Sequence, residues 1–217
     1  MEVVRKGNER YPMSGRAKLG KQPAGALMRY PREHKTTARN RVLERGARHA
    51  KKHGFRASGM DALAAAAGVT SGALYKHFDG KSDLFAALIA AELDRTEQRY
   101  AAILPDDPSA IGRAQSDYLS LQHVKRPDRG CVLPCLTSEV ATAGPAPRAS
   151  FQQGLLRIHA IFERWTGSSE KAWTLIAQNV GAVMLARALR DEDVQQRLLT
   201  AIEREGEHLL AERRRPG

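Results

Sequence analysis

The fold of this chain is decided by one stretch, Gly68-Val69-Thr70-Ser71-Gly72-Ala73-Leu74-Tyr75-Lys76-His77-Phe78. Gly68 can take the left-handed conformation that ends one helix, and Thr70 can cap the next. Within that second helix, steps of about 100° per residue bring Leu74 and Phe78 to one side, where they can anchor it. Two short helices joined by a three-residue turn are typical of a helix-turn-helix unit.

The opposite side of the second helix is suited to contact a DNA duplex. Its two smallest residues let the backbone come close to base edges, hydrogen-bond donors lie beside them, and further polar side chains flank the helix. The residues assigned to base edges are Thr70, Ser71, Gly72, Ala73 and Lys76, and those assigned to phosphates are Tyr75, His77 and Lys81. Each has an ordinary structural explanation when taken alone, but their combined spacing favours a DNA-binding surface.

The excess positive charge is confined to the first 85 residues, although the formal net charge of the whole chain is +11. Residues 1–37 hold nine Lys and Arg against three Asp and Glu, and residues 38–85 hold nine against four. Residues 86–217 hold seventeen of each sign. A basic front half on a neutral back half predicts one part that meets a polyanion, and charge alone leaves DNA, RNA and an anionic membrane surface open.

Periodicity predicts an all-α protein in three parts. Residues 1–36 show no helical or strand period and are expected to form a flexible basic arm. Residues 37–80 predict a three-helix helix-turn-helix domain, and residues 81–217 a helical C-terminal domain. Helices are expected from about residue 37 to 53, 58 to 68, 71 to 78, 81 to 103, 109 to 124, 132 to 143, 146 to 166, 169 to 190 and 194 to 213, the second with a capping box that starts at Ser58.

Composition excludes several classes of protein. No apolar run approaches the roughly 20 residues of a membrane span, and residues 1–36 lack the apolar stretch of a secretory signal. Two cysteines alone form no disulfide framework, so the cytoplasm is the expected location. After Tyr100 no pattern resembles a phosphate loop, a Ser-His-Asp set or an HExxH metal site, so neither catalysis nor a cofactor is expected.

The segment around this turn resembles the N-terminal domain of TetR/AcrR transcriptional regulators. The family pattern Gly-Val-x-x-Gly-x-Leu-Tyr-x-His-Phe-x-x-Lys-x-x-Leu is matched by Gly68, Val69, Gly72, Leu74, Tyr75, His77, Phe78, Lys81 and Leu84. The resemblance is strong over about residues 37–95, and beyond them only the helical layout agrees. Gly59 departs from the family, which often places a phosphate-binding hydroxyl residue there, and Ser58 is the candidate substitute.

The resemblance implies an all-helical homodimer. Its N-terminal domains bind adjacent major grooves of double-stranded DNA, and its C-terminal domains dimerise and hold a small-molecule effector. The chain is therefore expected to be a repressor that its effector releases from a palindromic operator. The predicted dimer interface combines apolar residues of segment 173–189 with those of the last helix, although periodicity alone equally allows an internal core.

The effector site is expected among the helices between Leu93 and Trp173. The candidate residues are Tyr100, Tyr118, His123, Cys131, Cys135, Phe162 and Trp165. For each of them core filling is the commoner explanation.

The two cysteines allow a more specific hypothesis. Pro134 is best tolerated in the first turn of a helix, which places Cys131 near free backbone amides that stabilise a thiolate. Cys131 is then a low-pKa thiol through which oxidants or electrophiles release the repressor. The alternative is a pair of small buried core residues. Cys131 and Cys135 alone do not complete a zinc site, so no metal is expected.

Other functions remain open at this point. The same fold also suits an activator or a DNA-binding protein without an effector. A helical enzyme, or a protein that applies the basic arm to a phospholipid surface, belongs to a different class.

Overall fold

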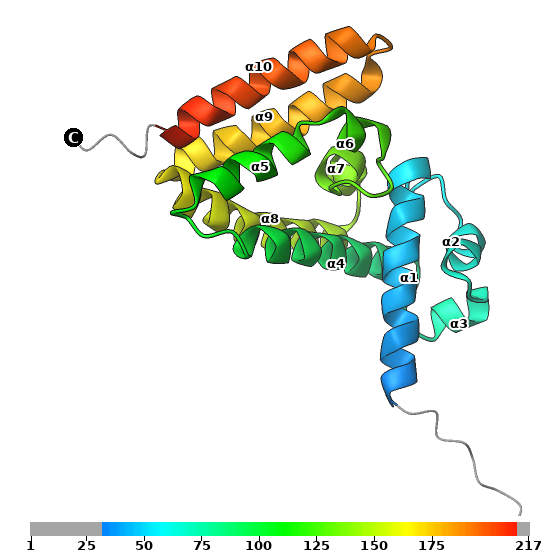
Figure 1. The fold of residues 1–217 in the computed structure, drawn as a ribbon. Helices are drawn as coiled ribbons and strands as arrows, with labels where there is room; N and C mark the ends of the chain where they lie inside the picture. Colours follow the sequence, from blue (N-terminus) through cyan, green and yellow to red (C-terminus); the bar gives the residue numbers. More distant parts are fainter. Residues whose placement is uncertain (1–31, 212–217) are drawn as a thin grey trace, which may run out of the picture. The chain divides into compact units, whose positions relative to one another are not determined.

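The computed structural model describes residues 32–211, which form ten α-helices and no β-strand within this range (Figure 1). The helices are α1 Arg32–His53, α2 Met60–Ala67, α3 Ser71–Tyr75, α4 Lys81–Ala101, α5 Pro108–Tyr118, α6 Leu121–Lys125, α7 Leu133–Ala141, α8 Pro145–Thr166, α9 Ser169–Ala188 and α10 Glu192–Ala211. The prediction of an all-α protein is confirmed. Residues 1–31, which make up most of the predicted arm, lie outside the described residues.

Helix α1 begins five residues earlier than predicted, at Arg32. Residues 32–36 are therefore helical and not part of an arm, because they contain no Gly or Pro that would stop a helix. The buried face of α1 includes Val42, Ala47 and Ala50. The helix ends where expected, at Gly54, whose φ of 82° lies in the left-handed region.

Helices α4 and α8 run side by side through the C-terminal part, and α9 lies between α8 and α10 (Figure 1). The approach of α4 to α8 is close because Gly154 of α8 has no side chain. A Cβ there would lie 2.6 Å from Leu93 Cβ, well inside van der Waals contact. The joints before and after α8 fall where the sequence predicts them, with Pro145 in the first turn and Gly167 at φ 71° after the last.

The helix predicted over residues 109–124 is in fact two helices, α5 and α6. Leu119 leaves the helical conformation, and the Ser120 side chain caps α6 by accepting a hydrogen bond from His123 N at 3.2 Å. The break turns Leu119 and Val124 toward α9 and α10, where they join a second hydrophobic cluster with Val183 and Leu199.

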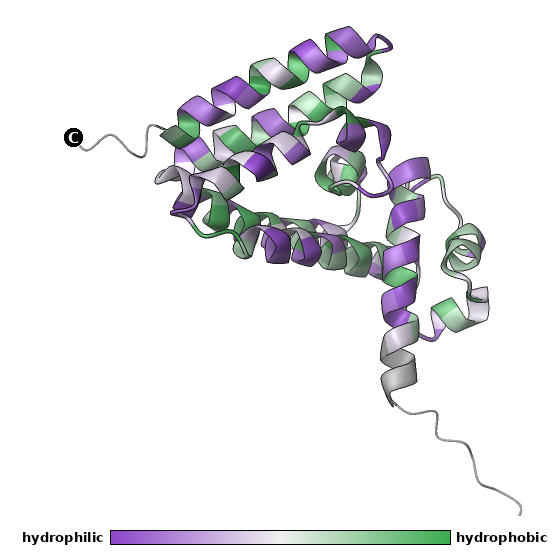
Figure 2. Cartoon of the chain, in the orientation of Figure 1, coloured by the Kyte–Doolittle hydropathy of each residue, from purple (hydrophilic) through white to green (hydrophobic). Residues whose placement is uncertain are grey.

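The main hydrophobic cluster extends from Val42 of α1 to Ile176 of α9 and so crosses the predicted domain boundary at residue 80. In Figure 2, α1 is mostly hydrophilic in colour and α2 is mostly pale green, which matches the Ala-rich sequence of α2. None of the helices in the described range is long and apolar enough to cross a membrane.

Candidate DNA-binding surface and effector cavity

The turn between α2 and α3 has the geometry that the sequence predicts. Gly68 follows α2 at φ 71°, and its N–H donates to Ala65 O at 3.0 Å while Val69 N donates to Ala64 O at 3.0 Å. These two bonds satisfy carbonyls at the end of α2. Thr70 then caps α3, because its hydroxyl oxygen accepts from Ala73 N at 3.2 Å.

Helix α3 is held by the two predicted anchors, Leu74 and Phe78, which are 0% and 1% exposed. It is shorter than predicted, since regular helix ends at Tyr75. His77 N and Phe78 N both donate to Leu74 O, at 3.0 and 3.1 Å, so the chain tightens into a turn at this point. The anchored side therefore faces the core and leaves the opposite side accessible.

That accessible side carries most of the predicted DNA contacts. Exposed residues are Thr70, Gly72, Tyr75 and Lys76, and half-buried ones are Ser71, Ala73 and His77. A Cβ at Gly72 would meet no atom of the described residues within 4 Å, so the backbone there is open to a close partner. We name this surface, residues 70–77, the α3 ridge. The Ser71 hydroxyl donates to the carboxylate of Asp61, so its hydrogen is already used in a bond within the protein.

Two predicted phosphate contacts do not fit the structure equally well. Ser58 is 4% exposed, and its hydroxyl donates to Gly54 O at 2.6 Å, so it cannot replace the hydroxyl residue that Gly59 lacks. That prediction is wrong, and so is the capping box, because Gly59 is the N-cap residue of α2. Lys81 is half-buried, and its Nζ donates to Arg56 O at 2.8 Å, which leaves it only partly available to a phosphate.

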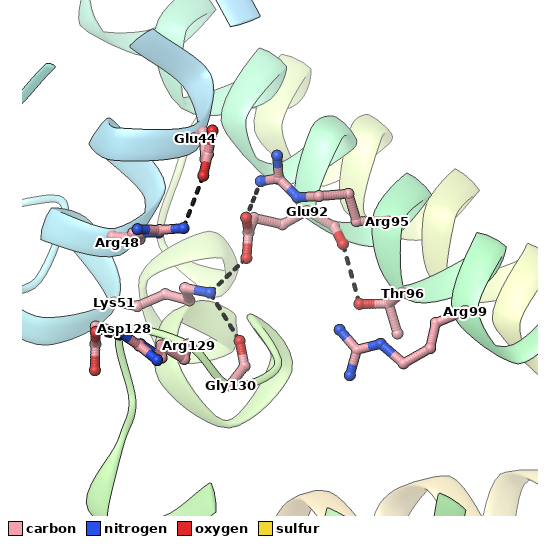
Figure 3. A pocket seen from close by; sticks show the side chains of 10 residues that line it. All are labelled: Glu44, Arg48, Lys51, Glu92, Arg95, Thr96, Arg99, Asp128, Arg129 and Gly130. Carbon is pink, nitrogen blue, oxygen red and sulfur yellow. Dashed lines mark hydrogen bonds and ion pairs between the residues drawn. The ribbon is translucent and has the colours of Figure 1, made fainter. Parts of the chain in front are cut away.

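A buried ion pair, which no local pattern in the sequence predicts, joins the DNA-binding part to the C-terminal helices. Lys51 Nζ of α1 lies 2.7 Å from Glu92 Oε2 of α4, with side chains 4% and 9% exposed. The same ammonium donates to Gly130 O at 2.7 Å, in the segment between α6 and α7 (Figure 3). Lys51 therefore ties three separate elements together. Its place in a run of basic residues gave no sign of burial.

A second junction lies at the other end of α7. Glu139 Oε1 accepts from Phe55 N at 3.1 Å, and Oε2 accepts from Arg56 N at 2.5 Å. These bonds hold the chain between α1 and α2. The position of the α3 ridge thus depends on contacts with α4, α7 and the segment before α7.

The predicted effector residues divide between different places. Tyr100, Tyr118, His123 and Cys131 line one cavity of about 630 Å³ beside α4, α5 and α6. Phe162 lines a small inner cavity of about 20 Å³ that adjoins it through three shared residues, Tyr100, Tyr118 and Cys131. Trp165 borders a separate hollow near Pro105 and Leu210. We call the first of these the effector cavity, since its volume suits a small organic molecule.

The low-pKa hypothesis for Cys131 is wrong. Leu133 N does donate to Cys131 Sγ, at 3.4 Å, as a position before a helix start predicts. Burial nevertheless dominates and raises the pKa of the Cys131 thiol, which is 5% exposed. The pKa of Cys135 is also raised by burial, although Arg187 Nη1 lies 3.1 Å from its Sγ. Both cysteines are free, and no group of three His, Cys, Asp or Glu in the described range is placed to hold a metal ion.

His123 is held in its neutral form by its two ring contacts. Nδ1 lies 2.7 Å from Tyr118 O, and Nε2 accepts from Cys131 N at 3.0 Å. The carbonyl requires a donor and the amide requires an acceptor, so the ring must carry its proton on Nδ1 alone. Burial is the main reason that the pKa of His123 is lowered, and the nearby guanidinium of Arg187 adds to it.

This lowered pKa predicts acid sensitivity. Above about pH 6.5 His123 is neutral in both the folded and the unfolded chain, whereas below it the unfolded chain binds the proton more readily. Stability should therefore fall as pH decreases through this range, and His123→Gln should reduce that fall. The measurement is Tm between about pH 7.5 and about pH 5.5. His208→Gln, at an exposed position of α10, is the control and should keep the wild-type slope; an equal slope in His123→Gln would contradict the prediction.

The two helices predicted to form a dimer face present their apolar residues differently. The apolar residues of α10 face inward and pack against the protomer's own two clusters; they are Leu198, Leu199, Ile202, Leu209 and Leu210. On α9 an outer stripe remains exposed, made of Trp173, Ala177, Met184, Leu185 and Ala188. We call it the α9 stripe. Leu185 is 60% exposed and Met184 44%, which is unusual for such large apolar side chains in one stripe.

Fold and surface together define a helix-turn-helix protein with a cavity-bearing helical C-terminal part. Residues 42–88 match the TetR family of bacterial regulatory proteins. The transcriptional regulator AcrR of Shigella flexneri is 32% identical over 90 residues, a match that spans 40% of this chain and 42% of AcrR. The helix-turn-helix part of the chain is therefore that of a TetR/AcrR-family DNA-binding transcriptional regulator. The match lies in a family of regulatory proteins, which agrees with the prediction that the chain is not an enzyme.

The fold extends beyond the segment of sequence similarity. NemR of E. coli, in its reduced form, superposes with a TM-score of 0.68 at 18% identity, over 79% of this chain and 96% of NemR. FadR of Bacillus subtilis, in complex with stearoyl-CoA, superposes with a TM-score of 0.59 at 15% identity, over 79% of this chain and 96% of FadR. At these identities the similarity establishes the C-terminal fold alone.

Proposed function

We propose that this chain is a dimeric transcriptional repressor that binds a palindromic operator in double-stranded DNA and leaves it when a small molecule fills the effector cavity. The observation that carries the proposal is the α3 ridge, which is exposed, nearly bare at Gly72 and anchored from behind by Leu74 and Phe78. A helix presented in this way suits the major groove. Its place of action is then the cytoplasm.

The α9 stripe supports dimerisation with a second copy of the chain. α9 is apolar on two sides, because one face packs inside the protomer through Leu175, Ala182 and Val183 while the α9 stripe stays exposed. Within the stripe, Trp173 stacks on His159 with ring centroids 4.2 Å apart. A single α3 ridge offers few side chains for sequence recognition. A two-fold axis through the α9 stripe doubles these contacts and produces an inverted repeat in the operator.

Leu185→Arg should convert the dimer to a monomer, because it replaces the most exposed large apolar side chain of the α9 stripe, 60% exposed, with a charge. Sedimentation velocity measures the change, and operator affinity should fall together with the loss of dimer. Leu104→Arg is the matched control, since Leu104 is 64% exposed but lies outside α9, between α4 and α5. If Leu185→Arg sediments like the wild type, the α9 stripe is not the interface.

Effector control is supported by the cavity and by its connection to α1. FadR, which shares this fold, holds stearoyl-CoA. In this chain Gly130 borders the effector cavity and also accepts the hydrogen bond from Lys51. A ligand that displaces this segment changes the support of α1 and hence the separation of two α3 ridges in a dimer, which lowers operator affinity by shifting the conformational population.

The experiment that tests DNA recognition is selection from randomised duplexes with the full chain. An enriched inverted repeat is expected, with half-sites spaced to place both α3 ridges on adjacent major grooves. Placing the selected sequence within a promoter then separates repression from activation by the sign of the change in transcription. Recovery of no enriched repeat would remove the basis of the proposed function.

A further inference from the structure

We infer that the effector cavity takes an organic anion with an apolar tail, a carboxylate or phosphate head held by arginines at the mouth and by the Tyr118 hydroxyl inside. This inference rests on the proposed function, because it names the chemical class of its effector. It follows from the charge of the cavity wall, from one unsatisfied buried hydroxyl and from the apolar surface behind them.

The cavity wall has a strong excess of positive charge. Its arginines are Arg99, Arg113, Arg126 and Arg129, and Asp117 is the carboxylate among the lining residues. The C-terminal part of the chain as a whole is electrically balanced, with seventeen residues of each sign in residues 86–217. The positive charge at this mouth is therefore a local concentration, which favours an anionic ligand over a neutral or cationic one.

Two of these arginines are free to bind a ligand. Arg126 and Arg129 share the carboxylate of Asp128, at 3.4 and 4.0 Å. Arg99 and Arg113 form no hydrogen bond or ion pair with any residue in the described part of the chain. Figure 3 shows the Arg99 side chain extending from α4 toward the segment that carries Gly130. A guanidinium binds a carboxylate or phosphate through two parallel hydrogen bonds, so a free pair at a cavity mouth suits an anionic head group.

The Tyr118 hydroxyl supplies an independent indication of a ligand. Its Oη is buried in the cavity wall without a hydrogen-bond partner of ordinary geometry in the described range, and the thiol of Cys131 beside it is only a weak partner. Burial raises the pKa of Tyr118, so the hydroxyl keeps its proton and remains a donor. A buried donor without an acceptor is unfavourable, and a ligand oxygen in the cavity satisfies it.

The remaining wall is suited to an apolar tail. Ile103 and the ring of Tyr100 line the same cavity, and the adjoining inner cavity is bounded by Ile158, Phe162 and Val180. Neutral His123 contributes an aromatic edge against Tyr118, with ring centroids 4.6 Å apart, and no charge. The head group of an amphipathic anion would thus contact the arginines at the cavity mouth, and its tail would contact the apolar side chains of the wall.

The position of the head group also explains how such a ligand acts on α1. Arg99, Arg129 and Gly130 line both the effector cavity and the neighbouring cavity of about 560 Å³ around Lys51 and Glu92 (Figure 3). Arg99, one of the two arginines proposed to hold the head group, therefore borders the same cavities as Gly130, whose carbonyl holds Lys51. Head-group binding and the support of the DNA-binding part therefore share one segment of chain.

The test uses three straight-chain probes with alkyl tails of nearly equal length and different heads: decanoate, decanol and decyltrimethylammonium. The full chain is titrated with each below its micellar concentration, and binding is followed by calorimetry and by Tm. Decanoate is expected to bind at least about tenfold more tightly than decanol, and the cation most weakly. Inorganic phosphate alone should bind weakly, because it lacks the tail.

Arg99→Gln/Arg113→Gln should lose the preference for decanoate over decanol by about tenfold or more while keeping wild-type Tm, because both side chains are exposed and unpaired. Tyr118→Phe should weaken the binding of decanoate more than that of decanol, because a carboxylate is the stronger acceptor. Arg148→Gln/Arg164→Gln removes the same two positive charges from exposed positions of α8 and is the matched control. Equal binding of decanoate and decanol, or a preference that survives in the double variant, would overturn the inference.

Operator binding, measured separately, keeps the two proposals apart. If the chain selects an inverted repeat but shows no preference for decanoate, the inference fails and the proposed function stands. If decanoate binds through Arg99 and Arg113 but no DNA sequence is selected, the anion site stands and the repressor proposal fails. If decanoate binds and also reduces operator affinity, both are supported.

Discussion

Gly72→Glu is expected to lower the affinity for the operator by about a hundredfold or more, while the free energy of unfolding stays unchanged or rises slightly. The side chain enters open space, so no core contact is lost. Replacing Gly with Glu inside a helix improves helix propensity by up to about 1 kcal/mol. The same side chain fills the gap through which the α3 ridge approaches base edges and brings a negative charge toward phosphates.

Gly112→Glu is the matched control for this substitution. Gly112 is also helical, in α5, and also has no neighbour within 4 Å of its position for a Cβ. It should show the same small gain in stability and keep wild-type affinity. Gel-shift titration on the selected operator and urea unfolding give the two quantities. Retention of operator affinity in Gly72→Glu would show that the α3 ridge does not enter the groove.

Lys51→Met is expected to lower the free energy of unfolding by about 3 kcal/mol, more than any surface charge in the chain. It leaves Glu92 buried with its pairing reduced to Arg95, which is 43% exposed. It also leaves the Gly130 carbonyl without its donor. Loss of one partner of a buried ion pair is costly, because the remaining charge stays away from water without compensation.

Two further variants separate this effect from a simple loss of charge. Arg48→Met breaks the neighbouring ion pair between Arg48 and Glu44, two side chains that are each about half exposed. It should lower the free energy of unfolding by no more than about 0.5 kcal/mol. Lys51→Met/Glu92→Met removes both buried charges and should recover most of the stability lost by Lys51→Met. Urea unfolding measures all three, and a double variant no more stable than Lys51→Met would contradict the explanation.

The parts of the site predicted correctly are those built from neighbouring residues. The cap at Thr70, the glycine at position 68 and the anchors Leu74 and Phe78 all lie within eleven residues of chain. Their geometry follows from helical period and backbone preference, which a sequence displays directly. The wrong predictions for Ser58 and Cys131 concern burial, which depends on how the folded chain packs and which no local pattern displays.

The amino-acid order by itself established an all-helical chain with a glycine-hinged reading helix and a basic front half, since these features arise from local conformational preference and charge count. Only tertiary packing decided that Lys51 is buried against Glu92, 41 residues away, and against Gly130, 79 residues away. It also decided that α10 turns its apolar face inward and that unpaired arginines gather at one cavity mouth. Such placements depend on how separate helices pack against one another, and the free energy of that packing is the sum of many contacts between residues far apart in the sequence.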